Sequence, residues 1–385
     1  MSTPVEFMGY PRNAGSAGIR NHLLILPTVI CANQVAQLIS QTVAGAAALQ
    51  HPFGCSQIGN DVDQTYRTLV GMGANANVGG VIIVGLGCET ISGEDLAESI
   101  ASFGKPVELV QIQACGGSDR TFQAGARLAR QLSQKLAKTK REPCSLSQLT
   151  VGIHCADLDD SVISLANPVI GKACDMLIAT QARVVLSEMP ELLKVSEELQ
   201  AKAETLPLAN AIRRVLLAWQ ERLTYGDRRI SHLPPGGGPV LPTRCESLGS
   251  LAKAGQEPIK EVLAYGQRPQ MAGLALMDTP STPVESITGM VAGGAQLVML
   301  ATGSGIPLGS PVAPVISISA STKAVALLEE HVDLDLTFLQ PNGRSLKDAV
   351  MELLDRIKQI AGGQQTKTER LGYRDFAINR IGPTV

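Results

Sequence analysis

The chain has 385 residues, of which 44% are hydrophobic and 18% are charged, and its formal net charge is −2 at pH 7. This length allows roughly two or three domains, and the near balance of charge gives no basic surface for nucleic acid. The longest apolar stretch near the N-terminus, residues 22–32, contains Pro27 and is too short to span a bilayer. We therefore expect a cytoplasmic protein that binds neither nucleic acid nor membranes.

Short apolar segments alternate with amphipathic segments, a pattern typical of parallel α/β architecture. The first part of the chain predicts strands over residues 23–28, 81–84 and 107–112, and helices over residues 35–43, 61–72, 93–103 and 120–137. A polar segment that contains proline, residues 138–148, then interrupts the pattern. We place a domain boundary there, which gives a first α/β domain over residues 1–145.

A second α/β domain is expected over residues 146–385. Its predicted strands are 149–154, 182–187, 274–277, 297–301 and 315–319, and its predicted helices are 166–179, 284–292, 322–331 and 346–361. Residues 190–225 are expected to form a long helical excursion with a break at Pro207, and the Pro/Gly-rich residues 233–242 to form a loop. The predicted fold is therefore two mostly parallel, doubly wound sheets of flavodoxin-like or Rossmann-like type, with helices on both faces.

Chemically active residues follow several predicted strands, where parallel sheets place their ligand sites. The apolar run over residues 78–84 is followed by Gly85, Leu86, Gly87, Cys88 and Glu89. Two further cysteines, at positions 55 and 155, also follow apolar segments, so three thiols are expected to converge. The dinucleotide fingerprint fits poorly because a threonine stands where its third glycine belongs, and the sequence contains no Walker A motif or nucleophile elbow.

Each candidate also has a structural interpretation. A free cysteine is most often a small buried hydrophobic residue, and the eight cysteines of this chain are expected to be reduced because the chain can build its own core. His51 and His154 are candidate ligands or bases, or they hydrogen-bond a loop. Glu89 and Glu188 close apolar strands, where a carboxylate costs free energy unless it is paired or coordinated.

Arg20 and Asn21 precede the first long predicted strand and leave two alternatives open. The forked guanidinium of an arginine suits a substrate carboxylate. The same pair could instead clamp the end of a helix.

Several strings, in order, resemble the altronate and galactarate dehydratase family, which also includes sulfolactate sulfo-lyase. They are GIRN from Gly18, HPFGC from His51, GLGCE from Gly85, LSEMPE from Leu186 and MVAGGAQ from Met290. The resemblance implies an iron-dependent carbon-oxygen lyase that removes water from a hydroxylated carboxylic or sugar acid, such as altronate or galactarate, to give a 2-oxo-3-deoxy acid. The alternatives are a sulfo-lyase acting on a sulfolactate-like acid and a non-catalytic binding or regulatory subunit.

By motif, the resemblance implies Cys55, Cys88, Cys155 and His51 as iron ligands, and either Fe2+ or an iron-sulfur cluster would suit such donors. It implies Glu89, Glu188 and His51 as catalytic groups. Substrate binding would fall to Arg20, Asn21, Gly116, Gly117, Thr302 and Ser304. Family members often carry a small SAF-type domain ahead of the large domain with which this chain begins. A separate SAF-domain subunit is therefore the expected partner, with a homo-oligomer as a further option.

Departures from the family pattern lie where the substrate would bind. The Cys-Gly-Gly-Ser-Asp string of the family is here Cys155-Ala156-Asp157-Leu158-Asp159, and the arginine of a Thr-Gly-Arg-Gly turn is Ser304. The lysine of a family Gly-Asn-Lys loop is missing next to Gly236. We expect a smaller or less charged substrate than a dianionic sugar acid.

Overall fold

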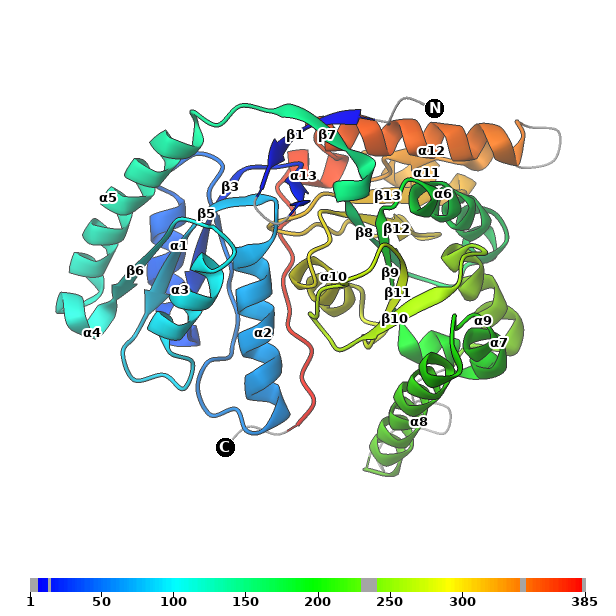
Figure 1. Ribbon diagram of the computed structural model, residues 1–385, viewed down its shortest axis with the longest axis horizontal. Helices are drawn as coiled ribbons and strands as arrows, with labels where there is room; N and C mark the ends of the chain where they lie inside the picture. The colour runs from blue at the N-terminus through cyan, green and yellow to red at the C-terminus, as the bar shows by residue number, and fades with distance from the viewer. Residues whose placement is uncertain (1–5, 13–14, 230–240, 340–343, 383–385) are drawn as a thin grey trace.

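Two parallel sheets, each with helices on both faces, make up the protein, and this confirms the predicted fold class (Figure 1). The computed structural model describes residues 6–12, 15–229, 241–339 and 344–382. All of the predicted strands are present, with ends that differ by a few residues. The predicted loop over residues 233–242 lies almost entirely outside the described residues.

The first sheet has four parallel strands in the order β4-β3-β5-β6. Its strands are β3 (His22–Pro27), β4 (Ala47–Ala48), β5 (Val78–Gly85) and β6 (Val107–Gln111), and its helices are α1 (Asn33–Ser40), α2 (Asn60–Ala74), α3 (Gly93–Ala101), α4 (Ile112–Cys115) and α5 (Ser118–Leu136). Along β5, Ile82 and Val84 pack toward α1 and α5, whereas Val81 and Ile83 pack toward α2 and α3. The unbroken apolar run of β5 therefore reflects burial on both faces.

The second sheet has seven parallel strands in the order β10-β11-β9-β8-β12-β13-β14. Its strands are β8 (Thr150–Cys155), β9 (Arg183–Leu186), β10 (Ile259–Leu263), β11 (Gly273–Met277), β12 (Leu297–Ala301), β13 (Val315–Ser319) and β14 (Leu334–Asp335). Its main helices are α6 (Asn167–Ala179), α9 (Arg244–Leu251), α10 (Pro283–Ala292), α11 (Thr322–Leu328), α12 (Leu346–Ala361) and α13 (Lys367–Leu371). In each sheet the order of successive strands reverses between two neighbours, which are β3 and β5 in the first sheet and β8 and β12 in the second. Ligand crevices form at such points.

A small antiparallel sheet that the sequence analysis missed lies between the two parallel sheets (Figure 1). It contains β1 (Glu6–Pro11), β2 (Ala17–Gly18) and β7 (Glu142–Ser145). Strand β7 falls within the segment over residues 138–148 that was interpreted as an interruption, and it pairs with β1 from the start of the chain. Such a short strand gives little sequence signal because its stability comes from a partner that is distant in sequence.

The helical excursion differs from its predicted form. It consists of η5 (Met189–Val195), α7 (Ser196–Ala201) and α8 (Leu206–Arg229). The break comes before Pro207, which is the second residue of α8, because proline is tolerated in the first turn of a helix, where its missing N–H is not needed.

Helices α2 and α10 connect the cores of the two sheets. At Gly71 a Cβ atom would overlap the carbonyl oxygen of Ala292, so glycine allows the two helices to approach closely. The C-terminal segment then runs along α2 (Figure 1), where Asp61 accepts hydrogen bonds from the backbone of Ile381 and Gly382. The two sheets therefore share one packed junction.

One stretch of the described chain, Val162–Ala179, is long and apolar enough by composition to cross a membrane. It comprises the π-helical turn η4 (Val162–Ala166) and α6, and it packs against α12 and η6 (Ala252–Ala254). The apolar composition of this stretch is therefore accounted for by packing within the protein.

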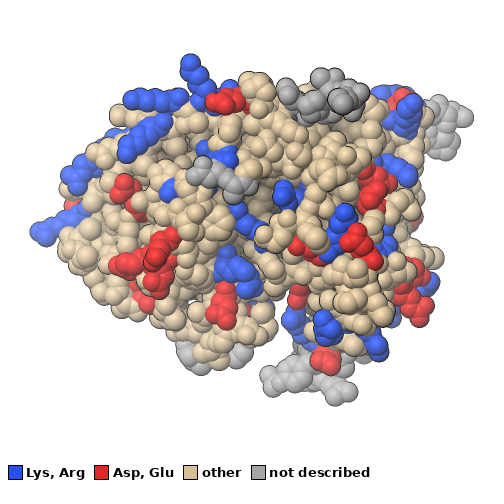
Figure 2. Space-filling model, viewed as in Figure 1, with Lys and Arg blue, Asp and Glu red and all other residues tan. Residues whose placement is uncertain are grey.

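Charged side chains are spread over the face shown in Figure 2, with two local concentrations of Lys and Arg. One lies over α5. The other borders a hollow near the middle of that face, where the two sheets of Figure 1 meet.

Candidate active site

Glu89 follows β5, at the point where the strand order of the first sheet reverses between β3 and β5. Four hydrogen-bond donors surround its carboxylate. The hydroxyl of Thr28, which follows β3, donates to Glu89 Oε1 over 2.5 Å. Backbone N–H groups of Leu86, Gly87 and Cys88 donate to the same carboxylate over 3.0, 2.6 and 2.9 Å. Burial alone would raise the pKa of Glu89, but these hydrogen bonds outweigh it and lower the pKa. The carboxylate is therefore a weak base that fixes the loop carrying Cys88.

His51 also holds a loop at this edge of the first sheet. Its Nε2 is 2.8 Å from the carbonyl oxygen of Pro27, and its Nδ1 accepts a hydrogen bond from the Phe53 N–H over 3.3 Å. Burial lowers the pKa of His51, and both ring nitrogens of the neutral imidazole are engaged with the backbone. The structure thus gives His51 a role in shaping the loop that leads to Cys55, rather than a free nitrogen for a metal or a proton.

The structure does not bring the three predicted cysteine ligands together. Cys55 and Cys88 are exposed at the first sheet, whereas Cys155 is buried at the end of β8 in the second sheet. Burial raises the pKa of Cys155, whose thiol donates to the carbonyl oxygen of Asp157 over 2.9 Å. Among the residues that the structure describes, no three His, Cys, Asp or Glu side chains are grouped to hold a metal ion. The predicted iron ligands therefore do not fit an iron site in this arrangement.

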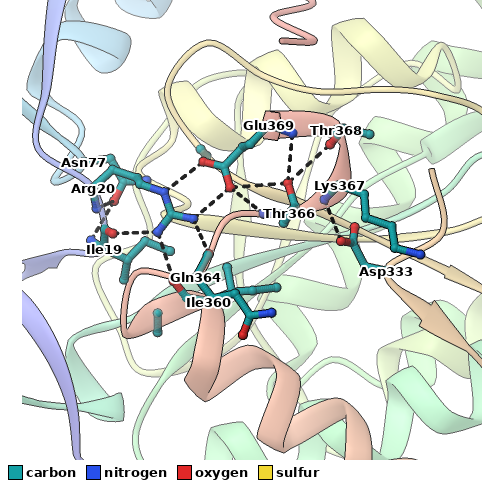
Figure 3. A network of polar contacts seen from close by, with 12 residues as sticks. Ile19, Arg20, Asn77, Asp333, Ile360, Gln364, Thr366, Lys367, Thr368 and Glu369 are labelled. Carbon is teal, nitrogen blue, oxygen red and sulfur yellow. Dashed lines mark hydrogen bonds and ion pairs between the residues drawn. The ribbon is translucent and has the colours of Figure 1, made fainter. Parts of the chain in front are cut away.

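Arg20 makes structural contacts where the sequence suggested substrate binding (Figure 3). Its Nε and Nη2 donate to the two carboxylate oxygens of Glu369, both over 2.8 Å, and its other donors reach the carbonyl oxygens of Ile19, Ile360 and Gln364. All five guanidinium N–H groups are thus donated within the protein. Arg20 clamps the C-terminal helices to the start of the first sheet, which is the second of the two alternatives that its position left open.

The other predicted substrate ligands near the first sheet are also engaged with the backbone or with side chains. Asn21 Oδ1 accepts from Arg12 over 2.8 Å, and Asn21 Nδ2 donates to the carbonyl oxygen of Leu136. Gly116 and Gly117 link α4 to α5 with positive φ angles of 77° and 122°, and their N–H groups donate to carbonyl oxygens of α4. These residues shape the chain where the sequence analysis expected substrate contacts.

A buried group of charged side chains lies at the carboxyl ends of β8 and β9 in the second sheet. Glu188 is fully buried and forms ion pairs with Lys253 Nζ and with His154 Nδ1, the latter over 2.7 Å. Its backbone has a φ of 72°, in the left-handed region, and its N–H donates to the Thr279 hydroxyl over 2.8 Å. A left-handed backbone conformation in a residue other than glycine is strained, and such strain is typical of functional sites.

His154 and Lys253 keep Glu188 ionised. Burial alone would raise the pKa of Glu188, but its interactions with His154 and with the charged Lys253 outweigh burial and lower the pKa to about 2. Lys253 is itself fully buried, and its Nζ donates to the Ser250 hydroxyl over 2.6 Å. The site therefore holds an ionised carboxylate in the buried interior.

Hydrogen bonds also fix the tautomer of His154. The Ser187 hydroxyl donates to the carbonyl oxygen of Ile153 over 2.9 Å, so its oxygen is left to accept from His154 Nδ1 at 3.1 Å. Both neighbours of Nδ1, Ser187 and Glu188, are acceptors, so Nδ1 carries a proton. The other ring nitrogen, Nε2, is buried without a hydrogen-bond partner among the described residues. His154 thus presents an unpaired nitrogen lone pair.

A second carboxyl group in this cluster has the opposite protonation state. Burial and the charge of Glu188 raise the pKa of Glu191 to about 8. Its Oε2 lies 3.3 Å from the Ser250 hydroxyl. Two carboxyl groups whose pKa values are driven apart by their environment are the usual arrangement of a general acid near a general base.

Asp157 follows β8, and its carboxylate reaches the turn after β12 that contains Thr302 and Ser304. Its carboxylate accepts from both hydroxyl groups, over 3.0 and 2.8 Å, and from the backbone N–H groups of Gly303 and Ser304. A cavity of about 410 Å³ adjoins this turn and is lined by Asp157, Ser304, Lys323 and others. The predicted substrate-binding turn therefore already holds an internal carboxylate and leaves fewer donors for an anionic substrate.

Three of these side chains were not singled out from the sequence: Lys253, Glu191 and Asp157. Lys253 stands in the string SLGSLAKAG, whose small and apolar residues are typical of a buried segment. A lysine within such a segment was the local signal that could have pointed to a functional cation. Glu191 closes the LSEMPE string that carries Glu188.

Comparisons with known proteins cover nearly the whole chain. Residues 9–137 match the second domain of D-galactarate dehydratase/altronate hydrolase, and residues 146–384 match the C-terminal domain of D-galactarate/altronate dehydratase. The chain is 31% identical to the (2R)-sulfolactate sulfo-lyase subunit beta of Chromohalobacter salexigens, over 97% of each protein. It is 30% identical to altronate dehydratase of Escherichia coli, over 99% of this chain and 79% of that enzyme, and 28% identical to altronate dehydratase of Bacillus subtilis, over 98% and 78%.

Proposed function

The chain belongs to the D-galactarate and altronate dehydratase family, and from this premise we propose that it eliminates water from a hydroxylated carboxylic acid to give a 2-oxo acid. It is a lyase, as its named relatives are. Elimination begins with loss of the proton on the carbon that carries the carboxylate, and this proton is only weakly acidic. Such a step needs a positioned base and a donor for the departing hydroxyl group.

The observation that carries the proposal is the unpaired Nε2 of His154 beside a proton-bearing Nδ1 that is held by Glu188. A carboxylate that orients an imidazole and stabilises its protonated form is a recurring base arrangement. We assign His154 Nε2 as the group that accepts the proton, and Glu188 as the carboxylate that orients the ring. Lys253 acts through Glu188, because its charge keeps that carboxylate ionised.

Glu191 is the proposed proton donor to the leaving hydroxyl. A carboxyl group with a pKa of about 8 is largely protonated at neutral pH. Transfer of the Glu191 proton to the departing oxygen releases water. Transfer of the proton that His154 accepted to Glu191 then restores both groups. The enol that remains converts to the 2-oxo acid.

A second candidate is elimination of sulfite from a sulfolactate-like acid. It is favoured by the sulfo-lyase subunit, which aligns with this chain over 97% of both proteins. The first proton transfer is the same, but sulfite leaves as an anion and needs no proton from Glu191. The name of that relative as a subunit also supports the proposal that a separate small subunit, of SAF type, completes the active enzyme.

The test is a turnover assay of the full chain, co-expressed with the small subunit and purified anaerobically with iron. Altronate, galactarate, sulfolactate and smaller hydroxy acids are supplied in turn, and 2-oxo acid and sulfite are measured. We expect 2-oxo acid from at least one hydroxy acid. Turnover of none of them would favour the non-catalytic binding or regulatory alternative.

The pH dependence of turnover tests the role of Glu191. Because its pKa is raised to about 8, the protonated form is present below that pH and is lost above it. For a hydroxy acid substrate, kcat is therefore expected to fall as the pH rises through about 8. In Glu191→Gln this fall should disappear and kcat at neutral pH should drop by about 100-fold. An unchanged alkaline limb in the variant would remove Glu191 from the mechanism.

The iron implied by the resemblance enters none of these steps, because its predicted ligands are not assembled. We expect Cys155→Ser, loaded anaerobically with iron, to contain as much iron per chain as the wild-type protein. Cys155 is buried on a different sheet from Cys55 and Cys88, and its thiol is engaged with the backbone. Elemental analysis measures this, with exposed Cys245→Ser as the control. Loss of iron from the Cys155 variant alone would support the three-cysteine site.

A further inference from the structure

We propose that a basic cavity at the junction of the two sheets binds a small multivalent oxyanion, such as phosphate or a polycarboxylate. The cavity has a volume of about 230 Å³, and Arg12, Lys105, Arg183 and Arg268 line it. It is separate from the proposed active site.

The four basic side chains lack an acidic counterpart. Among the described residues, no aspartate or glutamate lines the cavity and none of the four basic side chains takes part in an ion pair. Their known partners are neutral: Arg12 donates to Asn21 and to the carbonyl oxygen of Ala76, and Lys105 donates to the carbonyl oxygens of Asn75 and Val78. Like charges gathered in a partly buried cavity repel one another, and an anion would relieve that repulsion.

Two guanidinium groups also have buried N–H donors with no acceptor. Arg183 Nε and Arg268 Nη2 are buried and unpaired among the residues described. A buried donor without a partner costs free energy, so such positions in a native protein call for a ligand or an ordered water. The planar forks of two arginines suit the paired oxygens of a phosphate or a carboxylate.

Neighbouring residues hold the cations in place. The Arg268 guanidinium lies 4.5 Å from the centre of the Phe103 ring, and its stem passes Gly294, whose φ is 97°. Burial, together with the charges of Arg12 and Arg268, lowers the pKa of Lys105 to about 6, which indicates that these cations interact across the cavity. A bound anion would favour the charged form of Lys105 and add one more charged donor.

The position of the cavity distinguishes it from the active site. Arg183 begins β9 and Thr150 begins β8, whereas the proposed catalytic groups lie at or just beyond the opposite ends of these two strands. At about 3.3 Å per residue, these strands separate the two edges by roughly 13–17 Å. Lys105 comes from the chain before β6 of the first sheet, so an anion here would connect the two sheets and stabilise their junction.

Isothermal titration calorimetry of the full chain with inorganic phosphate, and separately with citrate, tests the proposal. We expect the wild-type protein to bind at least one of the two anions. The anion that binds shows whether the cavity accepts a phosphate or a polycarboxylate. Arg183→Gln should weaken binding by about tenfold, and the Arg183→Gln/Arg268→Gln double variant by about 100-fold. Lys347→Gln, which removes an exposed cation on α12, is the matched control and should bind like the wild type.

The same titration separates this proposal from the proposed function. Glu188→Gln, in which turnover is expected to be lost, should still bind the anion with wild-type affinity. The proposal is overturned if neither anion binds the wild-type protein at millimolar concentrations, or if the arginine variants, shown by circular dichroism to be folded, bind as tightly as the wild type. Anion-dependent stabilisation against heat should accompany binding and be lost in the double variant.

Discussion

Glu188→Gln is expected to lower kcat/KM by at least about 1,000-fold, the largest effect on activity that the structure predicts. An uncharged amide can neither hold the Nδ1–H tautomer of His154 as firmly nor stabilise the imidazolium that forms when Nε2 accepts a proton. Initial rates of 2-oxo acid formation measure the loss. Exchange of the substrate proton with solvent deuterium should fall in parallel, because the first step is affected.

The same substitution leaves Lys253 buried beside a neutral side chain, which is expected to lower the free energy of unfolding by about 3–5 kcal/mol. Glu188→Gln/Lys253→Met removes the unpaired cation and should recover most of that stability. It should not recover activity, because His154 still lacks its carboxylate. Recovery of turnover along with stability would show that Glu188 acts only in folding.

Arg20→Met is expected to lower the free energy of unfolding by about 3–5 kcal/mol, the largest structural effect among single substitutions away from the active site. It removes a bidentate ion pair and leaves Glu369, whose side chain is 15% exposed, without its cation. It also leaves the backbone acceptors Ile360 and Gln364 without their donor. Urea unfolding measures the loss, and Arg20→Met/Glu369→Met should regain most of it.

The pH dependence of the free energy of unfolding shows whether the Arg20–Glu369 ion pair stabilises the folded protein. Burial alone would raise the pKa of Glu369, but hydrogen bonds and the charge of Arg20 lower it. A carboxyl group whose pKa is lower in the folded protein adds stability above its unfolded pKa and loses it as the pH falls. The wild-type protein should therefore lose more stability than the double variant as the pH falls below about 4.5. If Arg20 instead bound substrate, Arg20→Met would raise KM while stability stayed unchanged.

The parts of this protein that could be predicted from sequence are those set by local pattern. The apolar run of β5 and the alternation of short strands with helices reflect burial on both faces of parallel sheets. Glu188 was a candidate for the same local reason, since a carboxylate that ends an apolar strand needs partners. Its partners could not be predicted, because Lys253 and His154 reach it only through the packing of η6 and β8 around the end of β9.

Predictions that depended on how the two sheets meet did not follow from local pattern. Cys88 and Cys155 both follow apolar strands, but those strands belong to different sheets. Arg20 precedes β3 and was compatible with two roles, and its ion pair with Glu369, near the other end of the chain, favours the clamp. The spacing of strands along the sequence does not show which sheet a strand joins or which distant residue pairs with Arg20.

The central claim is that catalysis takes place at the carboxyl edge of the second sheet, and two matched substitutions test it most directly. Initial rates of 2-oxo acid formation should be compared for Glu188→Gln and Glu89→Gln, since both glutamates end buried strands and both were candidate bases. We predict that Glu188→Gln loses at least about 1,000-fold, while Glu89→Gln stays within about tenfold of the wild type. The reverse result would contradict the account and would place catalysis at the first sheet, beside Cys88.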